Sequence, residues 1–139
     1  MRHTPRKWKN NMSNEVSQFK SKSGLGRILP AMGYAIAGLK AAWKNEHAFR
    51  QELVMVVILS VFALTLSISS FQKLFLIGVL VFVLIVELFN SAIEAVVDRV
   101  SLERHELSKN AKDMGSAAVM LSIFLAAASW IVVLFNRFY

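Results

Sequence analysis

Two carboxylates, Glu87 and Glu94, interrupt a stretch of the chain that is otherwise apolar from Leu74 to Val97. A charged carboxylate near the centre of a bilayer costs on the order of 3 kcal/mol even on lenient insertion scales. The two acids are seven positions apart and therefore share one face of a helix, with Asn90 and Ser91 between them. A polar stripe of this kind inside a membrane-spanning helix indicates a function.

The composition places the chain among membrane proteins. Of its 139 residues, 55% are hydrophobic and 18% are charged, and the mean hydropathy is +0.49. A soluble domain carries about 25% charged residues. Cysteine is absent, which excludes disulfides, thiolate metal sites and cysteine nucleophiles. Function therefore rests on carboxylates, amides and bases.

Three segments are long enough to cross a membrane. No ionisable residue interrupts 53–72 or 114–136, and each reaches the roughly 20 residues that a helix needs to cross about 30 Å of hydrocarbon. The remaining candidate is the stretch that contains Glu87, which lies between these two along the chain. We therefore expect an all-α membrane protein with spans at about 50–70, 74–98 and 113–136, within a single domain of residues 24–139. Its intramembrane acids must face other helices or a polar ligand, which predicts an oligomer.

The basic residues set the orientation. Most of the 16 Lys and Arg precede the first span, and most of the others lie between the second and third spans. By the positive-inside rule both regions, including the N-terminus, are cytoplasmic. Residues 1–23 are polar and basic, which predicts a disordered arm attracted to anionic headgroups. Residues 27–47 combine Tyr34 and Trp43 with lysines, which predicts an amphipathic helix on the cytoplasmic surface.

Several charged residues near the membrane surface have two interpretations. Glu46 and Arg50 are four apart, so they form a surface salt bridge worth about 0.5 kcal/mol, or Glu46 joins Glu94 as a hard oxygen ligand for magnesium on a nucleotide. The residues alone leave both open. Most of the residues between the second and third spans are expected to form a solvated loop. Lys112 and Asp113 are the exceptions, because they lie at the membrane surface, where a lysine can bind a polyphosphate. The small residues from Gly115 to Ala118 favour close helix packing.

Longer motifs carry a family resemblance. The run from Glu87 to Arg99, ELFNSAIEAVVDR, resembles the signature of the prokaryotic diacylglycerol kinases, small trimeric membrane kinases that include undecaprenol kinases. Ala41–Glu52, His105–Ser108 and Ala111–Ala118 extend the resemblance over nearly everything from Arg27 onward. The resemblance implies ATP-dependent phosphorylation of diacylglycerol to phosphatidic acid at the bacterial inner membrane. It also implies Mg²⁺ and a homotrimer, and no nucleic-acid partner.

The resemblance also implies roles for single residues. Glu87 matches the catalytic carboxylate, taken as the general base for the lipid hydroxyl, and Asn90 matches an active-site amide. Glu46 and Glu94 match the acids that hold the metal on ATP. Implied nucleotide contacts are Arg27, Tyr34, Glu46, Glu94, Glu103, Arg104, His105, Lys112 and Asp113. Implied substrate contacts are Arg27, Ala31, Tyr34, Ala35, Lys40, Ala41, Ala42, Trp43, Ala48, Phe49, Arg50, Gln51, Glu52, Glu87 and Ser116.

Three alternatives remain at this point. An undecaprenol kinase shares the acidic stripe but uses a polyprenol acceptor, and the runs Asn45–Glu52 and Met114–Ser116 favour diacylglycerol. A small proton-coupled transporter also buries a membrane glutamate, but it needs neither Glu46 nor the pair Lys112 and Asp113. A purely structural membrane subunit leaves the polar stripe unexplained.

Overall fold

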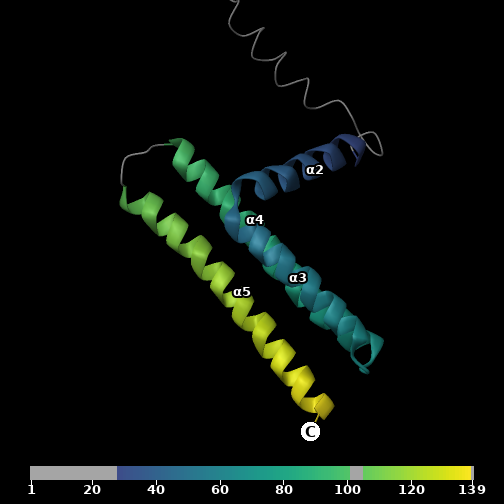
Figure 1. Ribbon diagram of the computed structural model, residues 1–139. Coiled ribbons are helices and arrows are strands. Elements are labelled where there is room, and N and C mark those ends of the chain that lie inside the picture. The colour runs from purple at the N-terminus through teal and green to yellow at the C-terminus, as the bar shows by residue number, and fades with distance from the viewer. Residues whose placement is uncertain (1–27, 101–104, 139) are drawn as a thin grey trace, which may run out of the picture. The chain divides into compact units, whose positions relative to one another are not determined.

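The computed structural model describes residues 28–100 and 105–138, and these are almost entirely helical. The helices are α2 (Ile28–Asn45), α3 (His47–Thr65), α4 (Ser70–Val100) and α5 (Glu106–Phe138) (Figure 1). The predicted N-terminal arm, and the predicted contacts Arg27, Glu103 and Arg104, lie outside the described residues. Within those residues, the all-α class is confirmed.

Three of these helices correspond to the expected spans in number and order, although α3 ends at Thr65, before the predicted end of the first span at about residue 70. By length and composition α3, α4 and α5 can each cross a membrane, which confirms the predicted number of spans. The sequence predicts a connector up to about residue 113, but α5 begins at Glu106. The residues before Gly115 include good helix formers and neither glycine nor proline. Lys109 and Asp113, four apart, also form an ion pair along α5, so the helix extends past the apolar segment.

The helix α2 covers most of the segment 27–47, for which the sequence predicts a surface helix. It begins just before Pro30, in the first turn of a helix, where the missing N–H and the fixed φ of proline are tolerated. The chain divides into two compact units between Leu39 and Lys40, so the residues of α2 up to Leu39 belong to the first unit and its last residues, with α3, α4 and α5, to the second.

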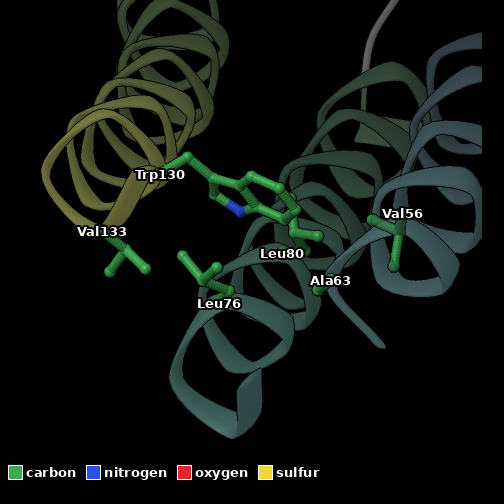
Figure 2. Packing of buried hydrophobic residues seen from close by; sticks show 6 residues of the cluster. All are labelled: Val56, Ala63, Leu76, Leu80, Trp130 and Val133. Atoms are coloured by element: carbon green, nitrogen blue, oxygen red, sulfur yellow. The ribbon is translucent and has the colours of Figure 1, made fainter. Parts of the chain in front are cut away.

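In the second unit, α4 packs against both α3 and α5. The hydrophobic core takes residues from all three helices, as Figure 2 shows. Trp130 of α5 also stacks on Phe62 of α3, with 6.2 Å between ring centroids. Many large apolar side chains of these helices remain exposed, as expected where lipid or neighbouring subunits cover them. The core residues are Val56, Ala63, Leu76, Leu80, Trp130 and Val133.

A capping box fixes the turn between α3 and α4. The Ser69 hydroxyl accepts from the backbone N–H of Gln72 at 3.2 Å, and the Gln72 side chain accepts from the N–H of Ser69 at 3.0 Å. These two bonds satisfy donors that the helix start leaves free. Lys73 also donates to the carbonyl of Leu64 at 2.8 Å, near the end of α3. These contacts therefore fix the start of α4 relative to the end of α3.

Truncation of Leu76 tests this core. Leu76 is 0% exposed, and Leu76→Ala is expected to lower the free energy of unfolding by about 3 kcal/mol, because the cavity is not refilled. Leu74, on the same helix and 70% exposed, supplies the control Leu74→Ala, for which a smaller loss is expected. Reversible unfolding in mixed micelles measures both. Equal losses would contradict the packing described here.

Candidate active site

Glu87 lies on the buried face of α4. Leu80, Val83, Glu87 and Ser91 follow one another at intervals of three or four residues and are all buried, which places them on one side of the helix. Glu87 is 4% exposed. The hydroxyl of Ser91 donates to its Oε1 at 3.5 Å. Glu87 is thus enclosed by protein within a single subunit.

Asn90 and Glu94 form the next turn of the polar stripe. The amide Nδ2 of Asn90 donates to Oε1 of Glu94 at 3.3 Å. The other amide atom, Asn90 Oδ1, is buried and has no hydrogen-bond partner. It lies against Gly115 of α5, where an added Cβ would collide with Oδ1 and would stand 3.4 Å from Cγ of the same amide. The close packing predicted at Gly115 is therefore packing against an active-site candidate.

An ion pair joins the end of α4 to the start of α5. Lys112 Nζ lies 2.6 Å from Oδ1 of Asp98, and the two side chains are 36% and 59% exposed. Lys109 and Asp113 pair at 2.8 Å within α5. Lys112 and Asp113, which the sequence predicts as nucleotide contacts, are thus each paired with an opposite charge, and both remain partly exposed to solvent.

The start of α3 carries Glu46 and Arg50. Glu46 occupies the N-cap position of α3 with an extended backbone, but its side chain makes no capping hydrogen bond. Arg50 instead donates to the carbonyls of Trp43 at 2.7 Å and Lys44 at 3.2 Å, and contacts Nδ1 of His47 at 2.7 Å. These bonds satisfy carbonyls at the end of α2. A Glu46–Arg50 salt bridge is not among the ion pairs of the described residues, so that interpretation of the spacing is wrong.

Residues of α3, α4 and α5 line a half-open cavity of about 420 Å³. Glu52 and Trp130 both line it, and the Oε2 atom of Glu52 and the Nε1 atom of Trp130 are buried without a hydrogen-bond partner. Glu52 and Glu87 repel each other, and Glu87 is also repelled by Glu46 and Glu94. Almost all the other lining groups are apolar: Gln51, Met55, Val56, Leu59, Leu80, Val83, Ile123, Ala126 and Ala127.

Metal ligation rests on few residues. Within 28–100 and 105–138, no group of three or more His, Cys, Asp or Glu side chains is arranged to hold a metal ion. Glu94 accepts one hydrogen bond, from Asn90, and the Glu46 side chain makes no capping hydrogen bond to the start of α3. Both acids therefore keep oxygens available to a hard cation.

Comparison with known proteins identifies the family. Residues 33–134 match the family described as prokaryotic diacylglycerol kinase. A diacylglycerol kinase of Pseudomonas aeruginosa is 52% identical over 118 residues, which cover 85% of this chain and 96% of that protein. One of Escherichia coli is 50% identical over 116 residues, covering 84% and 95%. One of Haemophilus influenzae is 40% identical over 113 residues, covering 81% and 96%.

The chain belongs to the prokaryotic diacylglycerol kinase family. The resemblance stated from the sequence is confirmed, and so is the expected class of enzyme, a membrane kinase that phosphorylates diacylglycerol. The transporter and the purely structural subunit are excluded with it.

The structure brings only some of the family's implied site residues together. Glu87, Asn90, Glu94 and Lys112 meet along α4 and the start of α5. His105 precedes α5 and accepts from the backbone N–H of Leu107 at 3.2 Å, and Ser116 is exposed on α5. The implied contacts Ala31, Tyr34 and Ala35 lie in the first unit, and the implied contacts from Lys40 to Trp43 lie at the end of α2.

Two residues near the candidate site, Asp98 and Trp130, are not among those that the sequence predicts. Asp98 follows Glu94 by four residues and so shares its face of α4, which is a signal that could have drawn attention to it. Trp130 lies inside an apolar span rather than at its end, where tryptophan is usually found. That position, too, is readable from the sequence. The pairing of Asp98 with Lys112, however, depends on how α4 and α5 pack.

Proposed function

We propose that the chain transfers the γ-phosphoryl group of ATP to the primary hydroxyl of diacylglycerol, forming phosphatidic acid in lipid recycling and phospholipid metabolism. The observation that carries the proposal is Glu87, a carboxylate 4% exposed in a helix apolar enough to cross a membrane. Three further acids repel it. An arrangement so unfavourable for stability is expected where acids must meet a lipid hydroxyl.

The proposed reaction consists of one proton transfer and one phosphoryl transfer. Glu87 accepts the hydroxyl proton of the lipid as that oxygen attacks the γ-phosphorus, and the bond from the γ-phosphorus to the β,γ-bridging oxygen breaks, releasing ADP. Lys112 places a fixed positive charge near the transferring phosphoryl group. Asn90 orients Glu94 through the hydrogen bond between them.

Mg²⁺ fits the residues assigned to it. Glu46 and Glu94 supply hard carboxylate oxygens, and Mg²⁺ on a nucleotide commonly needs only one or two carboxylates besides phosphates and waters. When bound, Mg²⁺ offsets the negative charge of the phosphates.

The lipid side of the site is assigned to α3 and the cavity. Gln51 and Glu52, two of the proposed substrate contacts, line the cavity, and its other walls are mostly apolar. Such a lining suits acyl chains, and the Glu52 carboxylate suits a polar headgroup near Glu87. Three further proposed substrate contacts precede Glu52 on α3, namely Ala48, Phe49 and Arg50. Further substrate contacts are proposed along α2 and at Ser116.

The nucleotide side is assigned to the junction of α4 and α5. His105, Lys112 and Asp113 lie at the start of α5, and Lys112 remains partly exposed. Arg27, Glu103 and Arg104 complete the proposed nucleotide contacts from outside the described residues. ATP is a solute of the cytoplasm, so this junction belongs to the cytoplasmic side.

Orientation and assembly follow from charge and exposure. The excess of Lys and Arg before the first span supports a cytoplasmic N-terminus in the bacterial inner membrane, with residues 27–47 as an amphipathic surface helix. Each span leaves much of its apolar surface exposed, which supports assembly with other copies, and we propose a homotrimer. Residues 24–139 then form the kinase domain behind a basic arm.

A lipid kinase assay tests the proposal. Purified protein in mixed micelles receives Mg²⁺, radiolabelled ATP and either diacylglycerol or undecaprenol, and the labelled lipid is identified. Labelled phosphatidic acid is the expected product, and removal of Mg²⁺ by a chelator is expected to stop its formation. Label in undecaprenyl phosphate alone would assign the polyprenol as acceptor, and no labelled lipid would refute the function.

A further inference from the structure

The ion pair between Asp98 and Lys112 has no role in the chemistry proposed so far. It joins two helices at 2.6 Å, and Asp98 lies one turn beyond Glu94 on α4. Lys112 therefore has two acids in its surroundings: Asp98 binds its ammonium directly, and Glu94 attracts the same ammonium more weakly. One of these acids is a proposed metal ligand and the other is not.

We propose that Asp98 is a positioning residue, which holds the Lys112 ammonium away from Glu94 so that Glu94 stays free to bind the metal of the nucleotide. This inference rests on the proposed function, because it gives Glu94 and Lys112 their roles in ATP binding. It adds a residue that acts through Lys112 and touches neither metal nor phosphate itself.

The geometry favours this division of roles. Glu94 accepts one hydrogen bond, from a neutral amide, so its charge is not neutralised by a cation. An ammonium has three donors, and the bond to Asp98 uses one of them, leaving others for a phosphate. Lysine has a flexible four-carbon stem, so its ammonium can move to another acid within reach. Glu94 also attracts this ammonium, so without Asp98 the ammonium would compete with the cation for the oxygens of Glu94.

The partial exposure of the pair limits the size of the effect. The side chains of Lys112 and Asp98 are 36% and 59% exposed, and solvent screens such pairs. Loss of one exposed ion pair changes an affinity by about fivefold at most. The expected effect is therefore a shift in metal affinity rather than a loss of turnover.

Metal binding is measured directly with Mn²⁺ as the probe. Electron paramagnetic resonance follows Mn²⁺ binding to the intact protein in micelles with a non-hydrolysable ATP analogue. Asp98→Asn is expected to weaken Mn²⁺ binding by about fivefold, and Asp98→Ala, measured in parallel, should do the same. Glu106→Gln makes the same change from carboxylate to amide at an exposed position of α5, and unchanged binding is expected there.

A double-mutant cycle separates positioning from a structural role. In the background of Lys112→Gln there is no ammonium to hold, so adding Asp98→Asn should leave Mn²⁺ binding unchanged. Equal weakening in both backgrounds, or no weakening in the single variants, would overturn the role of Asp98. The lipid assay on the unmodified protein is separate: absence of phosphatidic acid refutes the proposed function, whereas full activity with an unaffected Asp98→Asn refutes only this inference.

Discussion

Replacement of Glu87 by glutamine is expected to abolish lipid phosphorylation and to leave ATP binding nearly intact. Glutamine keeps the size of the side chain and the hydrogen bond that Ser91 makes to it at 3.5 Å, but it cannot accept the proton of the lipid hydroxyl. Loss of a general base reduces turnover by about 10²–10⁴-fold. The acid is 4% exposed, so a solvent base cannot readily replace it.

The measurement compares turnover with nucleotide binding. Initial rates of phosphatidic acid formation give kcat, and a fluorescent ATP analogue reports binding in the same micelles. Ser91→Ala is the graded companion, because it removes only the hydrogen bond to Glu87, and a loss below about tenfold is expected. If Glu87→Gln lost ATP binding as well, Glu87 would be a structural acid of the nucleotide site and not the base.

The same side chain shows why part of the site is readable from the sequence. A bilayer makes every intramembrane charge costly, so Glu87 and Glu94 stand out against an apolar background without any knowledge of tertiary structure. The number of spans is equally readable, because hydrocarbon thickness sets helix length. Both expectations need only local spacing and solvent physics, and α3, α4 and α5 confirm the one on the number of spans.

Contacts between helices were not readable in this way. Arg50 has Glu46 at the spacing of a helical ion pair, yet it binds carbonyls at the end of α2, because a helix break at Glu46 brings those carbonyls within reach. The start of α5 at Glu106 is not readable for a related reason: apolar length marks where a span must be helical, not where the helix begins. The partner of Lys112 and the cavity depend on packing, which one sequence does not determine.

Gly115→Ala is expected to cause the second large loss of activity, although it touches no proposed ligand of ATP or lipid. An alanine Cβ would collide with Oδ1 of Asn90, so either the amide turns away or α5 moves off α4. The amide donates to Glu94, and its displacement would disorient a metal ligand. Misplacement of a catalytic group by about 1 Å can cost about 10²-fold in rate. We expect a fall in kcat of this order.

The sign of the stability change distinguishes a collision from a simple helix effect. Alanine is the better helix former by about 1 kcal/mol, so without a collision the substitution should stabilise the protein. Overpacking costs about 1–3 kcal/mol, and a net loss is therefore expected at Gly115. Gly78, in α4, has nothing within 4 Å of an added Cβ, and Gly78→Ala is expected to keep full activity and equal or higher stability. Thermal unfolding and initial rates of both variants decide the matter: if Gly115→Ala behaved like Gly78→Ala, the approach of α5 to Asn90 would not be what holds Glu94 in place.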